Sequence, residues 1–276
     1  MVQIDNSLQT YLSEISDWQQ TMESNLRADN GWLTVVGLHW LNEGINTIGS
    51  ASDSIAQLPD SAPEKLGVIE FSNRQAHLQV TTDEVVTIDA VPVKSILLRD
   101  DHAENGPSLI KVGSITFFVI RRGDQYGIRV RDSDSPALTA FGGRHWFPVD
   151  TSYKVPATFT PYPVSRTIQV VNSVGLVIPM ENPGYVEFEL HNQQLRLEAF
   201  EAGETQWWFI FKDGTSGSST YGAGRFLYAP RGEDGTLWID FNRAYHPPCA
   251  FTYYATCPLP PKENVLGIRI EAGERF

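Results

Sequence analysis

The sequence predicts an all-β protein with one α-helix at its N-terminus and with its strands divided between two consecutive β-domains. Three observations support this fold class. A long helical spacing of apolar residues occurs only in the first thirty residues, short runs of β-branched and aromatic residues follow from Trp32 onward, and Gly, Pro, Asp and Asn separate these runs. At 276 residues, the chain is long enough for one large or two modest domains.

Residues 1–30 form the predicted helical segment. Asn6 or Ser7 can cap its start, and Asn30-Gly31 can end it. Apolar side chains recur at helical spacing, so we expect one stripe to pack on the β-structure that follows; they are Leu8, Tyr11, Leu12, Ile15, Trp18, Met22 and Leu26.

Residues 31–155 form the first predicted β-domain, a sandwich. Its expected strands are short and separated by turn residues, at 32–41, 45–50, 67–71, 76–81, 85–89, 94–100, 115–122 and 126–132.

Residues 156–276 form the second predicted domain, a β-sandwich or barrel. Its expected strands lie at 166–172, 175–179, 184–190, 194–201, 207–212, 224–229, 236–242 and 265–273. The segment 144–163 carries repeated prolines, so it is expected to be a loop, with a soft boundary near residue 155.

The charge balance limits the possible partners. The chain has 33 acidic and 21 basic residues, a net charge of −12, which repels nucleic acid. No apolar run is long enough to cross a membrane, and the acidic N-terminal segment does not resemble a signal peptide. We therefore expect a cytoplasmic protein, in which two cysteines do not form a disulfide framework.

The C-terminal part carries a distinctive pair of motifs, TYGAGRFLYA at 220–229 and DFNRAYHPPCAFTYYATCPLPPKENVLGIRIEAGE at 240–274. These resemble DUF1684, a family of unknown function, and the stretches 32–50, 121–136 and 141–150 are similar to its earlier segments. The resemblance implies no reaction. His246 stands where the resemblance would place Asn.

A fainter resemblance concerns the N-terminal half. EGINTIGSASDSIAQLP at 43–59 and SLIKVGSITFFVI at 108–120 are similar in rhythm to a forkhead-associated (FHA) β-sandwich. Such domains bind phosphothreonine through an Arg after the Ile-Gly step and a Ser-x-x-His. Here Ser50 occupies the Arg position and the His of SNRQAH comes two places late, so the resemblance implies the fold without the phosphopeptide function.

The strand at 236–242 delivers polar groups to the end of the second domain. Strand alternation puts Trp238, Asp240 and Asn242 on one face, and an inward-facing Arg225 requires a carboxylate partner, for which Asp240 is the natural candidate. A structural ion pair and a bidentate site for an anionic ligand are both open interpretations. The predicted ligand-binding residues are Arg225, Asp240, Asn242, Arg243, Tyr245, Arg144, Trp146 and His39.

His246, Cys249 and Cys257 raise two further hypotheses. They could supply three zinc ligands, although the spacing does not match paired C-x-x-C units. Cys249 could instead be a nucleophile with His246 as base and Asp240 as orienting group. Asp240, Arg243, His246 and Cys249 are therefore weak catalytic candidates; no metal and no cofactor is predicted, since nucleotide-binding and HExxH motifs are missing.

Five prolines in 247–261 exclude a central strand there and favour a stiff, extended cover, with Tyr245, Phe251, Tyr253 and Tyr254 packing beneath it. Whether the protein is an enzyme is left open. We expect it to bind an anionic or polar small molecule in the C-terminal β-domain. The alternative is a protein–protein interaction module that uses the FHA-like sandwich, with the C-terminal motif structural.

Overall fold

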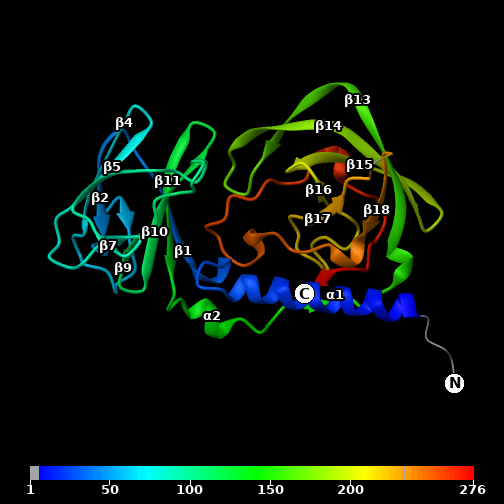
Figure 1. Ribbon diagram of the computed structural model, residues 1–276, viewed down its shortest axis with the longest axis horizontal. Helices are drawn as coiled ribbons and strands as arrows, with labels where there is room; N and C mark the ends of the chain where they lie inside the picture. Colours follow the sequence, from blue (N-terminus) through cyan, green and yellow to red (C-terminus); the bar gives the residue numbers. More distant parts are fainter. Residues whose placement is uncertain (1–5, 233) are drawn as a thin grey trace. The chain divides into compact units, whose positions relative to one another are not determined.

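The computed structural model describes residues 6–232 and 234–276, and it confirms the predicted fold class. Apart from the helices α1 (Asn6–Arg27) and α2 (Pro136–Ala140), the regular structure consists of β-strands and short 3-10 turns (Figure 1). Contacts divide the chain into two compact units. Unit 1 contains Met1–Ser24 and Gly142–Phe276, and unit 2 contains Asn25–Phe141. No helix among the described residues is long and apolar enough to cross a membrane.

The division between the units lies earlier in the chain than the residue-155 boundary expected from the prolines. The reason is the pairing of β12 (His145–Trp146) with β19 (Glu274–Arg275), which ties the segment after Gly142 to the C-terminus. Most of α1 is likewise assigned to unit 1 instead of standing as a separate segment.

Unit 2 is a sandwich of two sheets that share one core. The sheets have the orders β1-β11-β10-β9-β6-β7 and β3-β2-β4-β5-β8. Alternating strand residues from both sheets, such as Ile69 and Phe117, are fully buried between them. The strands are β1 (Val35–Trp40), β2 (Gly44–Gly49), β3 (Ala56–Gln57), β4 (Gly67–Ser72), β5 (Gln75–Val80), β6 (Thr87–Ile88), β7 (Val91–Pro92), β8 (Ser95–Leu98), β9 (Ile110–Val112), β10 (Ile115–Arg122) and β11 (Gln125–Asp132).

Two hairpins of unit 2 turn through a pair of residues that both have positive φ. Asn73 and Arg74 have φ of 50° and 61° between β4 and β5, and Asp89 and Ala90 have φ of 51° and 64° between β6 and β7. Positive φ at both central positions is the geometry of a type I′ turn, whose twist matches that of the flanking strands. These turns therefore set the register of the hairpins even though neither contains glycine.

Unit 1 is a six-stranded antiparallel sheet that curls until its two end strands lie next to each other. The strand order is β17-β16-β15-β14-β13-β18, and β17 and β18 are neighbours across the remaining gap. Figure 1 shows the long strands β13 and β14 curving over this nearly closed barrel. The strands are β13 (Lys154–Val171), β14 (Val177–Leu190), β15 (Gln193–Ala202), β16 (Gln206–Phe211), β17 (Arg225–Pro230) and β18 (Thr236–Asp240).

The expectation of a loop at 144–163 is wrong for its second half. Residues from Lys154 onward form the first part of β13 and pair with both β14 and β18. Pro156 and Pro161 occupy paired positions, opposite Trp238 of β18 and Gly184 of β14, and Pro163 lies where the register with β14 shifts between Pro161 and Arg166.

The predicted strand at 265–273 is also absent. The segment has the burial alternation of a strand, with Leu266, Ile268 and Ile270 buried in the core of unit 1. Its backbone, however, is bound largely by side chains from elsewhere, so no regular ladder forms. Alternation of apolar residues therefore reports an extended buried chain, and only hydrogen bonding makes it a strand.

Helix α1 supplies part of the core of unit 1. Tyr11 and Ile15 are buried, whereas Leu8 and Leu12, which lie on the predicted stripe, are 39% and 37% exposed. The buried face is thus narrower than the sequence pattern indicated.

Candidate binding pocket in unit 1

A pocket of about 520 Å³ lies beside α1, at the seam where β17 and β18 meet. Both neighbouring strands turn outward-facing side chains toward it, Tyr228 from β17 and Trp238 from β18. Its lining comes from segments far apart in sequence, and consists of Trp18, Met22, Lys154, Gln206, Tyr228, Pro230, Trp238, Asp240, Arg243 and Tyr245. This volume falls in the usual range of small-molecule sites.

Asp240 is the acidic group of the pocket, and its carboxylate is already bound. The Tyr11 hydroxyl donates to its two oxygens at 2.9 and 3.1 Å, and the amide of Asn242 donates at 3.1 Å. Burial, and next the charge of Asp240, raises the pKa of Tyr11 well above its usual range, so the phenol stays protonated and can donate. Asp240 thus fixes the helix and the following 3-10 turn in place.

Two cations face the same pocket. Arg243 Nε lies 3.5 Å from Asp240 and Nη2 lies 4.0 Å from the exposed Glu14. Lys154 lies over the rings of Tyr11 and Trp238, with Nζ 4.7 and 5.9 Å from the centroids. No carboxylate of the described residues forms an ion pair with Lys154. The pocket therefore contains two cationic groups and one carboxylate that is already engaged.

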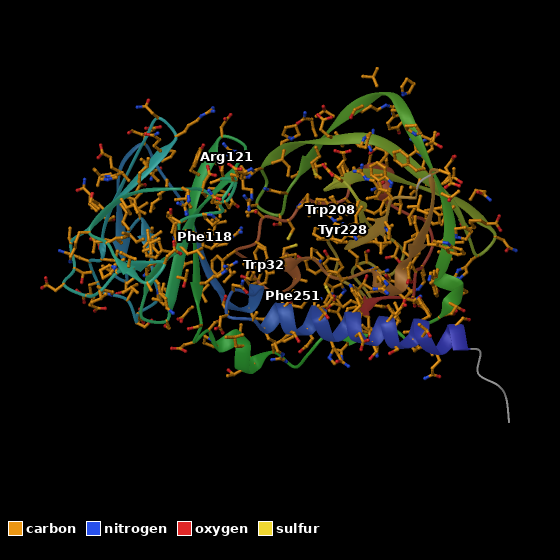
Figure 2. All side chains as sticks on the ribbon, in the orientation of Figure 1. Trp32, Phe118, Arg121, Trp208, Tyr228 and Phe251 are labelled. Carbon is orange, nitrogen blue, oxygen red and sulfur yellow. The ribbon has the colours of Figure 1, made fainter. Side chains whose placement is uncertain are left out.

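The walls of the pocket are aromatic. Tyr228 stacks on Trp208 with ring planes 11° apart, and Figure 2 labels the two residues next to each other. Tyr245 also stacks on Tyr228, with ring planes 20° apart, and Trp18 meets Tyr245 edge to face. Burial is the main cause that raises the pKa of Tyr245, which keeps this wall uncharged. Flat, neutral walls of this kind favour a planar ligand.

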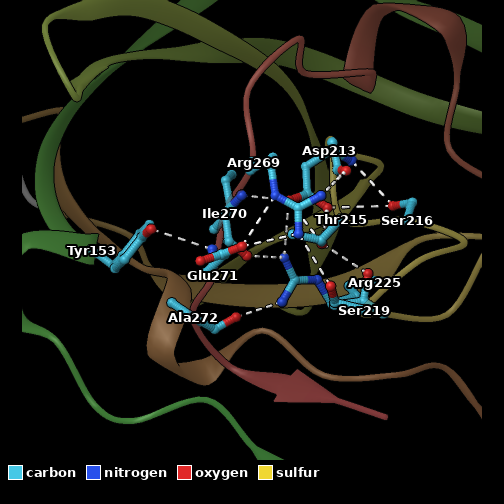
Figure 3. A network of polar contacts seen from close by, with 12 residues as sticks. Tyr153, Asp213, Thr215, Ser216, Ser219, Arg225, Arg269, Ile270, Glu271 and Ala272 are labelled. Atoms are coloured by element: carbon cyan, nitrogen blue, oxygen red, sulfur yellow. Dashed lines mark hydrogen bonds and ion pairs between the residues drawn. The ribbon is translucent and has the colours of Figure 1, made fainter.

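Arg225 lies inside the barrel and does not pair with Asp240. Its Nη2 lies 3.4 Å from Asp213, and the guanidinium donates to the carbonyls of Ile270 and Ala272 at 2.9 and 2.5 Å (Figure 3). The predicted Arg225–Asp240 pair is therefore wrong. Arg225 shares the inward face of β17 with Leu227, whereas Asp240 lies on the outer face of β18, beside the exposed Trp238.

Arg144 and His246 belong to a second buried cluster around Glu274. Arg144 Nη1 lies 2.5 Å from Glu274, and His246 Nδ1 lies 3.7 Å from it. Burial raises the pKa of Glu274 to about 7 and lowers the pKa of His246 to about 3. These residues anchor the C-terminal strand β19; Arg144 does not line the pocket, and Trp146 contacts it only through Trp18.

The hypothetical Cys-His-Asp triad is not assembled. His246 Nε2 accepts a hydrogen bond from the Tyr221 amide at 3.1 Å, and Asp240 is bound by Tyr11. Across residues 6–232 and 234–276, no group of three or more His, Cys, Asp and Glu side chains is arranged to hold a metal ion. Cys249 and Cys257 are not joined by a disulfide.

The remaining candidates divide between the pocket and other places. Asp240, Arg243 and Tyr245 line the pocket, and Asn242 lies behind it, bonded to Tyr11 and to the carbonyl of Asp150. His39 lies on β1 of unit 2, where its ring bonds the backbone of Gln57, and burial lowers its pKa. Of the aromatic cover, Phe251 is half-buried but Tyr253 is 97% exposed, so the expectation that Tyr253 packs beneath the prolines is wrong.

Several pocket residues were missed by the sequence analysis. The prolines around it place Lys154 in an expected loop, and helical spacing gives Trp18 only a packing role. Strand alternation places Trp238 beside Asp240 but gives no sign that Tyr228 lies at the same pocket, because the meeting of β17 and β18 is set by the barrel.

The fold and the pocket define a two-unit β-protein with an aromatic, cation-bearing pocket in unit 1. Residues 139–275 match the family model described as protein of unknown function (DUF1684), which confirms the resemblance over this part of the chain. The earlier stretches 32–50 and 121–136, which resembled the same family, lie outside the match.

Among solved structures, the chain is similar to an uncharacterized protein of Haloarcula marismortui, from gene locus rrnAC0354. The identity is 29%, the TM-score is 0.43, and the match covers 50% of this chain and 78% of that one. No curated protein matches the sequence.

The faint FHA likeness is found again in the structural comparison. The FHA domain of FhaA, solved in complex with the intracellular domain of Rv3910, is 23% identical with a TM-score of 0.25, over 34% of this chain and 97% of that one. A second FHA domain, analysed for phosphothreonine-dependent interactions, is 24% identical with a TM-score of 0.25, over 36% and 96%. At these TM-scores the likeness supports no inference about binding.

Proposed function

We propose that unit 1 binds a small, planar organic anion in the pocket beside α1. The observation that carries the proposal is the placement of Lys154 and Arg243 in one aromatic-lined cavity whose acidic group, Asp240, is already bound by Tyr11. An anion would gain charge-assisted hydrogen bonds, and a flat body would gain contact with the rings.

The electrostatics favour an anion over a cation. Arg243 directs Nε toward Asp240 and Nη2 toward Glu14, which leaves Nη1 without an ion-pair partner among the described residues. Lys154 is held only by rings, whose faces attract its charge without neutralising it. A ligand carboxylate placed between Lys154 and Arg243 would give each of these cations an ion-pair partner.

Titration of tryptophan fluorescence with 2-naphthoate tests this proposal, because Trp18 and Trp238 both line the pocket. We expect saturable quenching and a rise in Tm with 2-naphthoate, and much weaker effects with the uncharged 2-naphthamide. Lys154→Met should weaken 2-naphthoate binding about tenfold, since a charge-assisted contact contributes roughly 1.5 kcal/mol.

The matched control is Lys262→Met, which removes the same charge from a side chain that is 90% exposed and outside the pocket. The affinity of the Lys262→Met variant for 2-naphthoate should equal that of the wild type. Equal binding of the acid and the amide, or equal losses in the two variants, would contradict the proposal.

A further inference from the structure

In the proline-stiffened segment after β18, Cys249 and Cys257 lie in contact and are not joined by a disulfide. The backbone amide of Cys249 donates a hydrogen bond to Cys257 Sγ at 3.3 Å, which closes the short loop 249–257. Cys257 is buried, whereas Cys249 is half-buried and so can be reached by a small reagent. One accessible thiol and one protected thiol are thus kept next to each other.

The backbone on both sides of this contact is fixed. The Ser173 hydroxyl accepts from the amide of Cys257 at 3.1 Å, and the Ser173 amide donates to the Cys257 carbonyl at 2.8 Å. The carbonyl of Cys249 accepts from the Tyr221 hydroxyl at 3.0 Å. Pro248 and Pro258 flank the two cysteines and restrict the chain further. The thiols therefore meet at little entropic cost.

The surroundings favour the thiolate of Cys249. A hydrogen bond from the Cys257 thiol, with a smaller contribution from the neighbouring Tyr221 hydroxyl, lowers the pKa of Cys249 to about 7 against the opposing effect of burial. Burial is the main cause that keeps the pKa of Tyr221 above its usual range, so its hydroxyl remains a donor. A substantial fraction of Cys249 is then ionised at neutral pH, as in reactive cysteines.

We propose that Cys249 and Cys257 form a peroxide-reactive dithiol, in which Cys249 is the attacking residue and Cys257 the resolving one. The Cys249 thiolate attacks one oxygen of hydrogen peroxide; the O–O bond breaks, and the leaving hydroxide takes up a proton to become water. The Cys257 sulfur then attacks the resulting sulfenic acid, the S–OH bond breaks, and a second water leaves as the disulfide forms. The two sulfurs together lose two electrons, and the peroxide is reduced.

The test is oxidation of the full chain with hydrogen peroxide, followed by intact-mass and peptide mass spectrometry. We expect the loss of two hydrogen atoms per chain, a linked peptide pair containing Cys249 and Cys257, and recovery of both thiols with dithiothreitol. The Cys257→Ser variant, treated in the presence of dimedone, should carry the adduct on Cys249. The Cys249→Ser variant should carry none on Cys257.

Alkylation with iodoacetamide provides a second measurement that needs no variant. At pH 7, Cys249 should react at least about tenfold faster than Cys257, because thiolate fraction and exposure both favour it. Two free thiols after exposure to excess peroxide, disulfides only between chains, or dimedone trapping on Cys257 instead of Cys249 would each overturn the proposal.

Discussion

At the scale of single residues, the buried side chains of Arg225 and Asp213 bind the backbone of residues 270–272. Arg225 is fully buried and donates to backbone carbonyls that have no ladder partner, while Asp213 accepts the Ile270 amide at 2.6 Å. The pair thus replaces the hydrogen bonds that a strand would have provided for this segment. The sequence predicts that Arg225 needs a carboxylate if it faces inward, with Asp240 as the candidate, but the actual carboxylate, Asp213, lies in a loop whose position depends on the whole barrel.

Arg225→Met should lower the free energy of unfolding by about 3–5 kcal/mol, because it leaves Asp213 buried without its countercharge. Urea denaturation measures this loss. The control is Arg269→Met, which removes a half-exposed guanidinium paired with Glu271 and should cost within about 1 kcal/mol. Comparable losses in both variants would show that Arg225 does not have this role.

The lowered pKa of the buried His246 side chain leads us to expect that the stability of the protein depends on pH. Its pKa falls from 6.5 to about 3 on folding, so the unfolded chain binds the proton more tightly, and His246 removes stability as the pH falls from 6.5 toward 3. Glu274 acts in the opposite direction: its pKa rises to about 7, so the stability it contributes at low pH is lost as the pH rises from 4.5 through 7.

The His246→Asn variant separates the two effects, since Glu274 is present in both proteins. Between pH 6.5 and 3, the variant should lose less stability on acidification than the wild type, by at most about 1.4 kcal/mol per pH unit. Denaturation series at several pH values measure the difference. Parallel profiles would mean that His246 does not resist protonation.

At the scale of elements, the local sequence pattern does not determine which groups the backbone of a segment bonds to. Residues 265–273 alternate like a strand and are extended, but Leu266 and Ile268 bond the backbone of 212–214, and side chains bind the backbone of 270–272. Residues 154–163 contain prolines like a loop, but they belong to β13, where Pro156 and Pro161 occupy paired positions and Pro163 lies in the register shift. In both cases the neighbours in space decided the outcome.

The turn between β6 and β7 allows a direct test of local strain. Ala90 has φ of 64°, a conformation that costs an L-residue roughly 1 kcal/mol and glycine nothing. Ala90→Gly should therefore raise the free energy of unfolding by about 0.5 kcal/mol after the added chain entropy is subtracted. Ala90→Val, which enlarges the side chain at the same φ, should lower it; a destabilising Ala90→Gly would show that the turn does not have this geometry.

At the scale of the whole molecule, unit 1 is assembled from two distant stretches of the chain. Residues of α1 complete the pocket and bind Asp240, although more than two hundred positions separate Tyr11 from Asp240. The candidate site is therefore a product of tertiary structure: each wall has an ordinary local role, and only the folded unit brings Trp18, Lys154 and Arg243 together.

Ile15→Ala tests the contribution of α1 to unit 1. Ile15 is fully buried, so the truncation should lower the free energy of unfolding by about 2–5 kcal/mol. Leu12→Ala, on the same helix but at a position that is 37% exposed, should cost less than about 1 kcal/mol. Far-UV circular dichroism during denaturation measures both, and equal losses would contradict the observed packing.

The sequence alone determined the fold class, the N-terminal helix, the shared strand face of Arg225 and Leu227 and the absence of a central strand in 247–261, because these follow from side-chain periodicity and from the chemistry of proline. It also brought forward Asp240, Arg243 and Tyr245, which line the pocket. Only the tertiary structure decided that Asp213 pairs with Arg225, that Lys154 and Trp18 belong to the pocket, and that Cys249 meets Cys257. The physical reason is that periodicity fixes which way a side chain points within its own element, while partners are set by closure of the barrel.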